Sequence, residues 1–149
     1  MTRRRQLVLF PGNRRLPRSD AEFRLHCAVA DTLRRSLSPG WIWFHVPNGG
    51  ARQKKITADG RVVSIEGGRL KRMGVRPGVS DIVLIGPPNG RVHVLELKRF
   101  GEEPDCDQWP FLSEVKAAGG KAGWADTYDG AIALLTRWGA LRHRIEVSA

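Results

Sequence analysis

Cysteine is scarce in this sequence, and long apolar runs are absent. Two cysteines, Cys27 and Cys106, occur among 149 residues, and two are too few for a disulfide framework or a zinc site. We therefore expect reduced thiols in a cytoplasmic protein. No segment approaches the length of a membrane span, and the apolar stretch at residues 7–10 is too short for an export signal. Neither secretion nor membrane insertion is expected.

Acidic residues are also few, because 15 Asp and Glu stand against 25 Lys and Arg, a formal net charge of +10. A basic excess of this size favours a polyanionic partner, with nucleic acid first and an anionic membrane surface second. The alternative is a basic protein that is merely soluble. Residues 1–18 form an arginine-rich N-terminal arm, which either follows phosphates or is a solvated tail.

Hydrophobic spacing predicts one α/β domain over residues 19–149, without internal repeats. The buried side of the first helix is expected to carry Phe23, Cys27, Ala30, Leu33 and Leu37. The expected elements are a helix at 19–37, a strand at 41–46, hairpin strands at 82–85 and 92–97, a helix at 107–118, a short strand at 122–127 and a helix at 128–139. Between the first strand and the hairpin, residues 48–78 are basic and irregular, with one short strand at 61–65; long loops of this kind are often functional.

Three polar residues stand at the open end of the hairpin. If the turn is centred between Pro88 and Asn89, Asp81 faces Glu96 across the two strands, and strand alternation puts Lys98 on the same side. Facing carboxylates repel when both are ionised, so a divalent cation between them would explain their placement. Alternatively, Asp81 is a turn residue and the other two form the solvated face of an edge strand.

This group of residue types suits metal-assisted phosphodiester hydrolysis. Carboxylate oxygens are ligands that Mg²⁺ prefers, and Mg²⁺ shares its remaining shell with water and phosphate oxygens. An ammonium group beside the cation can orient the attacking water or stabilise the charge that develops on phosphorus.

The order of the segments resembles that of the VRR-NUC family. Glu22 in the first helix is followed by HVPNGG, then LKRMGVRPGVSDIVLI, VHVLELK and DQWPFLSEVKAAGG. The resemblance covers residues 20–138, and PNGG and RPGVSD with ELK are fairly specific in combination. VRR-NUC is a branch of the PD-(D/E)XK nuclease superfamily, found in phage and bacterial proteins and in eukaryotic DNA-repair nucleases. It implies a restriction-endonuclease-like core, with a mixed sheet flanked by helices and the metal site on the hairpin.

The resemblance assigns roles to the residues at the hairpin end. Asp81 and Glu96 match the metal-binding acids of the family, and Lys98 matches its catalytic lysine. The backbone carbonyl of Leu97 matches a further metal ligand in similar nucleases. The implied cofactor is Mg²⁺ or Mn²⁺.

Two further residues have both a family role and an ordinary structural one. Glu22 matches an acid on the first helix that reaches the same metal, but three residues after Ser19 it also fits a capping box. Gln108 matches a glutamine near the scissile phosphate or the lysine, but it also lies where a helix cap is needed.

The basic segment is the expected DNA contact. Asn48 and the glycines after it either form a turn or bring the loop against DNA. Phosphate contacts fix position and carry little sequence information, so recognition by DNA shape is expected. The residues expected to contact phosphates are Arg52, Lys54, Lys55, Lys71, Arg72 and Arg76.

The implied activity is that of an endonuclease acting on structured DNA, such as four-way junctions or flaps. Stand-alone members of the family tend to be homodimers, which would supply two active sites. Trp41, Trp43 and Trp138 are candidate interface anchors or core residues. The alternatives are a basic DNA-binding protein that does not cut, and a sequence-specific restriction-type nuclease on the same core; RNA as substrate is also open.

One position departs from the superfamily pattern. Ser80 stands where the superfamily has proline before the acid, which leaves open how Asp81 is aimed. His45 and His93 have no partners at metal-ligand spacing, and we expect them to be packing or surface residues.

Overall fold

The computed structural model describes residues 18–47, 55–63 and 65–142. The expected N-terminal arm therefore lies almost wholly outside the described residues, as do the predicted DNA contacts Asn48, Arg52 and Lys54. The last residues of the sequence, 143–149, also lie outside them.

A four-stranded mixed sheet forms the centre of the molecule, in the order β1-β4-β5-β6. The strands are β1 Ile42–His45, β4 Ile82–Gly86, β5 Arg91–Leu97 and β6 Lys121–Ala125. β4 pairs antiparallel with both β1 and β5, whereas β6 pairs parallel with β5. A parallel pair needs a crossover connection, and here the crossover carries helix α3, Gln108–Ala117.

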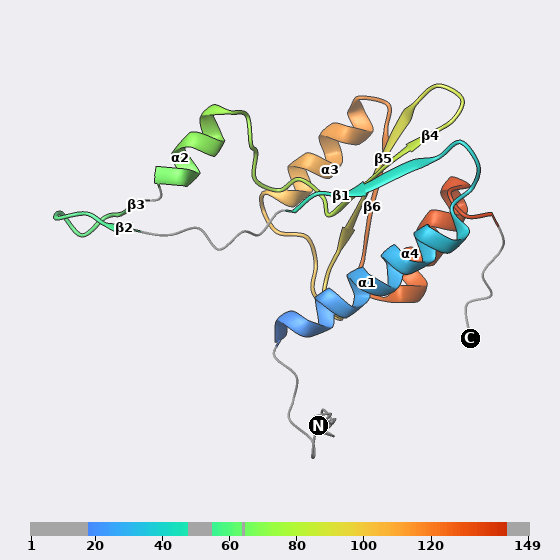
Figure 1. Ribbon diagram of the computed structural model, residues 1–149, viewed down its shortest axis with the longest axis horizontal. Helices are drawn as coiled ribbons and strands as arrows, with labels where there is room; N and C mark the ends of the chain where they lie inside the picture. The colour runs from blue at the N-terminus through green and yellow to red at the C-terminus, as the bar shows by residue number, and fades with distance from the viewer. Residues whose placement is uncertain (1–17, 48–54, 64, 143–149) are drawn as a thin grey trace, which may run out of the picture.

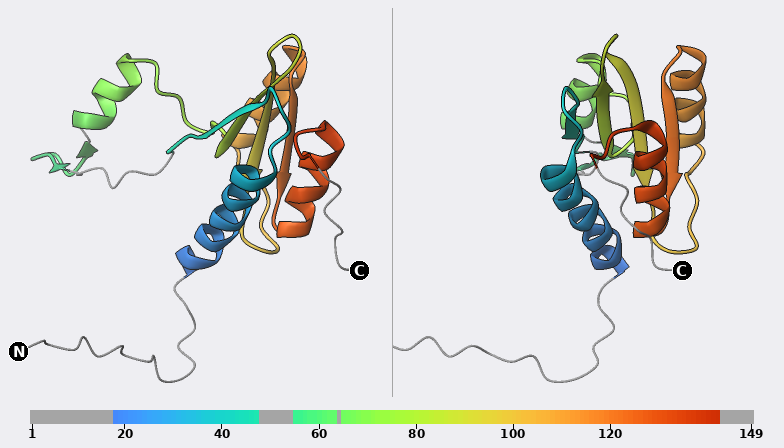
Figure 2. Two further views of the ribbon diagram at one scale, coloured as in Figure 1. Left: turned by 45° about the vertical axis from the view of Figure 1, so that its right-hand side comes forward. Right: turned by 90° about the vertical axis from the view of Figure 1, so that its right-hand side faces the viewer.

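Helices cover both faces of this sheet. α1 Arg18–Ser36 and α4 Tyr128–Trp138 lie against one face and α3 lies against the other (Figures 1 and 2). These three helices agree with the sequence prediction to within two residues at each end. The expected mixed sheet flanked by helices is thus confirmed.

The main core lies between the sheet and the helices α1 and α4. Every second residue of the hairpin points into it, including Ile82 and Leu84 of β4 and Leu95 and Leu97 of β5, all fully buried. Burial of an aliphatic side chain of this size contributes about 1.5–3 kcal/mol. The hairpin is therefore well anchored up to the residue where its polar end begins.

The register of the hairpin is the one that the sequence predicted. Val83 pairs with Val94 and Ile85 with Val92. Extending this pairing by one residue beyond Ile82 and Leu95 places Asp81 opposite Glu96. The alternation also puts Glu96 on the sheet face that α3 covers, opposite to Leu95 and Leu97.

The aromatic residues around His93 confirm its packing role. His93 is buried, and its ring lies 4.8 Å from that of Trp41 and 5.4 Å from that of Trp138. Trp41, Trp43 and Trp138 are all half-buried against the core. Cys27 and Cys106 are both free thiols.

The segment before the hairpin is more regular than the sequence predicted. It contains a two-stranded ladder of β2 Lys55–Ile56 and β3 Val62–Val63, followed by the helix α2 Ile65–Arg72. The expected strand at 61–65 is therefore correct at Val62–Val63 and wrong at Ile65, where α2 begins. Consecutive glycines, Gly67 and Gly68, lower the helix propensity of this stretch and hid α2 from the sequence prediction. β2, β3 and α2 project away from the sheet (Figure 1). From here on, 'the arm' means residues 55–72 and not the N-terminal residues 1–18.

The expected buried side of α1 is confirmed at Ala30 and Leu33, which are buried, and is wrong at Phe23, whose side chain is 68% exposed. Cys27 is half-buried, and Leu37, also half-buried, lies just beyond the end of α1. Phe23 instead borders a cleft, because the first turns of α1 extend past the core. No helix among the described residues is both long and apolar enough to cross a membrane.

Candidate active site

The open end of the hairpin borders a cleft of ≈680 Å³. It is lined by side chains from α1, from the end of β1, from both hairpin strands and from the start of α3. Five predicted catalytic residues line it, namely Glu22, Asp81, Glu96, Lys98 and Gln108. The fold thus brings together residues that are up to 86 positions apart in the sequence.

Asp81 is fixed at both ends by backbone contacts. Its carboxylate oxygen Oδ2 accepts a hydrogen bond from the backbone N–H of Leu97 at 2.9 Å. Its carbonyl oxygen accepts one from the backbone N–H of Val46 at 2.8 Å. The Asp81 carboxylate is therefore held against the neighbouring strand, beside Glu96.

Glu96 is the most unusual charged group of the site, because only 2% of the residue is exposed. Its oxygen Oε2 is buried and has no hydrogen-bond partner among the described residues. Burial, with the nearby charge of Asp81 as the second cause, raises the pKa of Glu96 to about 7. Lys98 acts in the opposite direction but does not offset them. A buried carboxylate without full compensation is a frequent mark of a functional site.

Lys98 lies directly beside this carboxylate. Its Nζ is 3.3 Å from Oε1 of Glu96, and its side chain is 14% exposed. The backbone N–H of Lys98 donates to the carbonyl of Ala125 at 2.9 Å, so the parallel pairing with β6 continues to the lysine. The sheet thus fixes the backbone of Lys98, from which the side chain reaches the Glu96 carboxylate.

Gln108 connects Glu96 to the start of α3. Its Nε2 donates to Oε1 of Glu96, and its Oε1 accepts a hydrogen bond from the backbone N–H of Asp105 at 2.9 Å. The capping role that the sequence left open is present as well, because Asp105 Oδ1 accepts from the N–H groups of Asp107 and Gln108, which completes the reciprocal pattern of a capping box. Gln108 therefore both caps the start of α3 and orients the Glu96 carboxylate.

Glu22 lines the cleft from the first turns of α1. α1 begins at Arg18, so Ser19 lies inside the helix and not at the position that a capping box requires. This placement favours the role of Glu22 in the cleft over the alternative of a capping-box partner.

Sequence reasoning missed two histidines in the cleft. His26 of α1 and His45 of β1 both line it, and their rings meet edge to face with centroids 4.3 Å apart. Burial, and then the proximity of His45, lowers the pKa of His26, while the charge of Asp81 acts against both. No spacing in the sequence links positions 26 and 45, so only the fold brings them together.

Gly78 is a further residue whose importance the sequence did not reveal. It has a φ of +76°, and a Cβ at this position would lie 2.2 Å from the carbonyl oxygen of Asp107. The chain before Asp81 therefore runs directly against the start of α3. This close approach places Gln108 within reach of Glu96.

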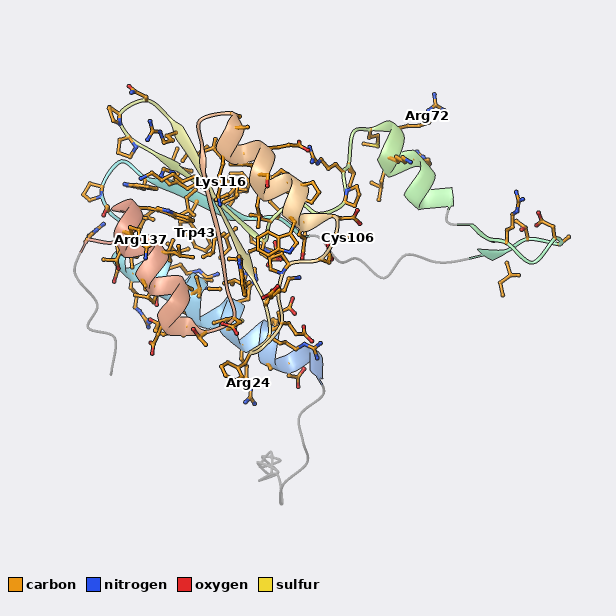
Figure 3. All side chains as sticks on the ribbon, turned by 180° about the vertical axis from the view of Figure 1, so that it is seen from behind. Arg24, Trp43, Arg72, Cys106, Lys116 and Arg137 are labelled. Carbon is orange, nitrogen blue, oxygen red and sulfur yellow. The ribbon has the colours of Figure 1, made fainter. Side chains whose placement is uncertain are left out.

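The predicted DNA-contacting residues lie in two places. Lys71 and Arg72 are exposed in the last turn of α2, and Figure 3 shows Arg72 pointing away from the molecule. Lys55 belongs to β2. Arg76 instead forms a bidentate ion pair with Glu114 of α3, with distances of 2.7 and 3.0 Å. A phosphate would have to compete with Glu114 for this guanidinium group.

The residues of the cleft fit a divalent cation in their chemistry, although they do not form a complete ligand cage. Among the described residues, no three His, Cys, Asp or Glu side chains are grouped closely enough to hold a metal ion. However, Asp81 and Glu96 offer hard carboxylate oxygens, and the buried Oε2 of Glu96 lacks a partner among the described residues, which a cation would supply. Few protein ligands are typical of Mg²⁺, which keeps several waters.

Solved structures that match this chain include two with related descriptions. One, described as a VRR_NUC domain protein, has a TM-score of 0.62 over 81% of this chain and 89% of its own, with 18% sequence identity. Another, described as a VRR_NUC domain, has a TM-score of 0.49 over 79% and 97%, with 14% identity. No family model and no curated protein matches the sequence. On the basis of the first match, the chain has the fold of a VRR_NUC domain protein.

Proposed function

We propose that the protein is a divalent-metal-dependent endodeoxyribonuclease. The observation that carries this proposal is the buried Glu96 carboxylate, with one unpartnered oxygen, between Asp81 and the ammonium group of Lys98. Burial of the Glu96 carboxylate beside the negative charge of Asp81 is unfavourable without a further cation. The fold of a VRR_NUC domain protein supports the same activity.

Each residue of the cleft has a distinct role in this proposal. Asp81 and Glu96 would hold the metal, with Glu22 and the carbonyl of Leu97 as further ligands. When bound, Mg²⁺ or Mn²⁺ would supply Lewis-acid chemistry to a phosphate oxygen and to water. Lys98 orients the attacking water and stabilises negative charge on the phosphate. Gln108 keeps the Glu96 carboxylate directed at the metal.

The proposed substrate is structured DNA, such as a four-way junction or a flap. Basic side chains of the arm, Lys71 and Arg72 among them, would contact phosphates, which fixes position on DNA without reading sequence. The alternative is a restriction-type nuclease on the same core, and cutting of linear duplex DNA at a fixed sequence would favour it. RNA as the substrate is tested by the RNA hairpin in the cleavage assay described below.

We further propose a homodimer, which would supply two active sites for paired cuts. β1 is an edge strand with Ile42 and Phe44 exposed on one face, at 60% and 46%. An apolar edge strand is usually covered in a functional assembly. Light scattering measures the molar mass, and we expect that of a dimer. The molar mass of a monomer would contradict the proposal and would mean that this face stays exposed.

A cleavage assay tests the proposed function. Labelled four-way junction, flap, single-stranded and linear duplex DNA, and an RNA hairpin, are incubated with Mg²⁺, Mn²⁺ or EDTA. We expect metal-dependent cutting of branched DNA that Asp81→Asn and Lys98→Ala each reduce by at least 10²-fold, while DNA binding by Lys98→Ala stays near the wild-type level. Tight binding without cutting in either metal would establish the non-cleaving alternative instead.

Glu22→Gln separates the metal role of Glu22 from a structural one. The amide keeps the shape of the side chain but is a weaker metal ligand, so we expect a higher Mg²⁺ requirement with an unchanged melting temperature. Cutting at the wild-type rate over the whole Mg²⁺ titration would remove Glu22 from the ligand set.

A further inference from the structure

His45 is exposed, yet its side chain makes a hydrogen bond to the backbone of Asp81 at the candidate metal site. It is the last residue of β1, and its Nδ1 lies 2.9 Å from the carbonyl oxygen of Asp81. A carbonyl oxygen only accepts hydrogen bonds. The proton is therefore on Nδ1 of His45, and this ring nitrogen is the donor.

The Asp81 peptide consequently has two donors from the same strand end. The backbone N–H of Val46 and the imidazole Nδ1–H of His45 both bind its carbonyl oxygen, at 2.8 and 2.9 Å. Asp81 lies just before β4, beyond the last paired residue Ile82. The sheet ladder therefore does not fix this peptide by itself.

Ser80 makes an additional restraint necessary. A proline before Asp81 would lock its own φ near −65°, but serine leaves this torsion free. Ser80 is fully buried, yet its hydroxyl group has no hydrogen-bond partner among the described residues, so its side chain contributes no restraint of this kind. The contacts of the Asp81 carbonyl fix its backbone, and the Leu97 N–H holds its carboxylate, so both ends of Asp81 are restrained.

His26 supports the His45 ring from the side of α1. The two rings meet at 83° with centroids 4.3 Å apart, the edge-to-face geometry that aromatic rings favour. Nε2 of His26 is buried without a hydrogen-bond partner among the described residues. The contact between these rings is therefore a packing contact, which limits rotation of His45 about its side-chain bonds.

We propose that His45 is a positioning residue that aims the Asp81 carboxylate at the metal by holding the Asp81 peptide through Nδ1–H, with His26 bracing its ring. This inference rests on the proposed function in one respect, namely that Asp81 is a metal ligand. Contacts behind a metal ligand commonly change metal affinity or activity by 10–100-fold when they are lost.

Two substitutions separate the hydrogen bond from the ring. His45→Asn keeps an N–H donor at the distance of Nδ1 from the backbone but removes the ring. His45→Phe keeps a ring against His26 but removes the donor. Mn²⁺ binding without DNA, followed by the electron paramagnetic resonance signal of free Mn²⁺, gives a readout that does not depend on cleavage.

We expect His45→Phe to weaken Mn²⁺ binding by 10-fold or more, and His45→Asn to retain most of the wild-type affinity. In the cleavage assay, His45→Phe should raise the Mg²⁺ concentration needed for half-maximal rate and leave the KM for DNA unchanged. Unchanged Mn²⁺ affinity in His45→Phe, or equal losses in both variants, would overturn the proposal. A raised KM for DNA without a metal effect would overturn it too, in favour of a direct DNA contact.

His26 provides a second pair of variants if His45→Phe does not fold. His26→Phe keeps the ring contact and should bind Mn²⁺ as the wild type does, whereas His26→Ala should bind it more weakly. Equal affinities in these two would contradict the bracing role. If the Mn²⁺ results follow this pattern but no nucleic acid is cut, the positioning role stands and the nuclease activity fails; absent Mn²⁺ binding by the wild type would defeat both.

Discussion

Glu96 in the metal-free protein is held in an environment that disfavours its charge. Burial raises its pKa from an ordinary value of 4.5 to about 7, so the folded state binds a proton more tightly than the unfolded state does. The stability that this preference gives is fully present below pH 4.5 and is lost as the pH rises through about 7. A difference of this size corresponds to about 3 kcal/mol.

Glu96→Gln should therefore stabilise the metal-free protein at pH 8. The neutral amide keeps the shape of the side chain and has no charge to desolvate, so the melting temperature should rise by on the order of 10 °C. At pH 4.5 the two proteins should melt alike, because Glu96 is then protonated. Calorimetry in EDTA at both pH values checks this.

Metal addition and a matched control complete this experiment. Mg²⁺ should raise the melting temperature of the wild type at pH 8 by binding the folded state, and should have little effect on Glu96→Gln. The control is Glu103→Gln, which changes an exposed glutamate and should leave the melting temperature unchanged. A wild type that is more stable than Glu96→Gln in EDTA at pH 8 would show that Lys98 and Gln108 compensate the buried charge fully.

Among the contacts between elements, the one between residues 76–80 and the start of α3 does most to determine the geometry of the site. It has no room for a side chain at Gly78, and it places Gln108 against Glu96. Arg76 strengthens the same contact through its ion pair with Glu114 and its position 5.2 Å from the Phe111 ring. The segment therefore couples the helix that orients Glu96 to the chain that leads to Asp81.

Gly78→Ala should damage the site more than a strained backbone alone explains. Both Gly78 and Gly74 have positive φ, but a Cβ at Gly74 meets nothing within 4 Å. Gly74→Ala should thus cost only the left-handed backbone penalty of about 1–2 kcal/mol. Gly78→Ala should cost more in urea unfolding and should also lower kcat, because Asp107 must move and Gln108 with it. Equal effects of the two substitutions would argue against the positioning role of this contact.

The elements that the sequence predicted are those that local patterns determine. Alternation in the hairpin, together with its turn, specified the register and so placed Asp81 opposite Glu96. α2 was not predicted, because its glycines disfavour a helix. The contact of the His45 side chain with the Asp81 carbonyl joins residues 36 positions apart, and the contact of Gly78 with the Asp107 carbonyl joins residues that are also far apart in the sequence. In both contacts the partner is a backbone carbonyl, which every residue has, so no residue type in the sequence marks the pair.

On the scale of the whole molecule, the described residues form a core with the fold of a VRR_NUC domain protein and a basic arm. The core holds all of the described candidate catalytic residues, whereas the arm ends in Arg69, Lys71 and Arg72 and stands apart from the sheet (Figure 2). In the proposed function, the core carries out the cleavage reaction and the arm binds the DNA backbone. Substitutions in the arm should therefore change DNA affinity and its salt dependence, and leave the chemical step intact.

Removing two charges from the arm tests this separation. Each phosphate contact releases counterions, so log Kobs falls with log salt by about 0.9 per contact on duplex DNA. Lys71→Ala with Arg72→Ala should reduce the slope by about 2, weaken binding at low salt and leave kcat at saturating DNA unchanged. Lys116→Ala with Arg137→Ala is the matched control, since it removes the same charge from exposed positions in the last turns of α3 and α4. If the control lowers the slope as much as the arm variant does, the arm contributes only to the overall positive field of the protein and makes no phosphate contacts of its own.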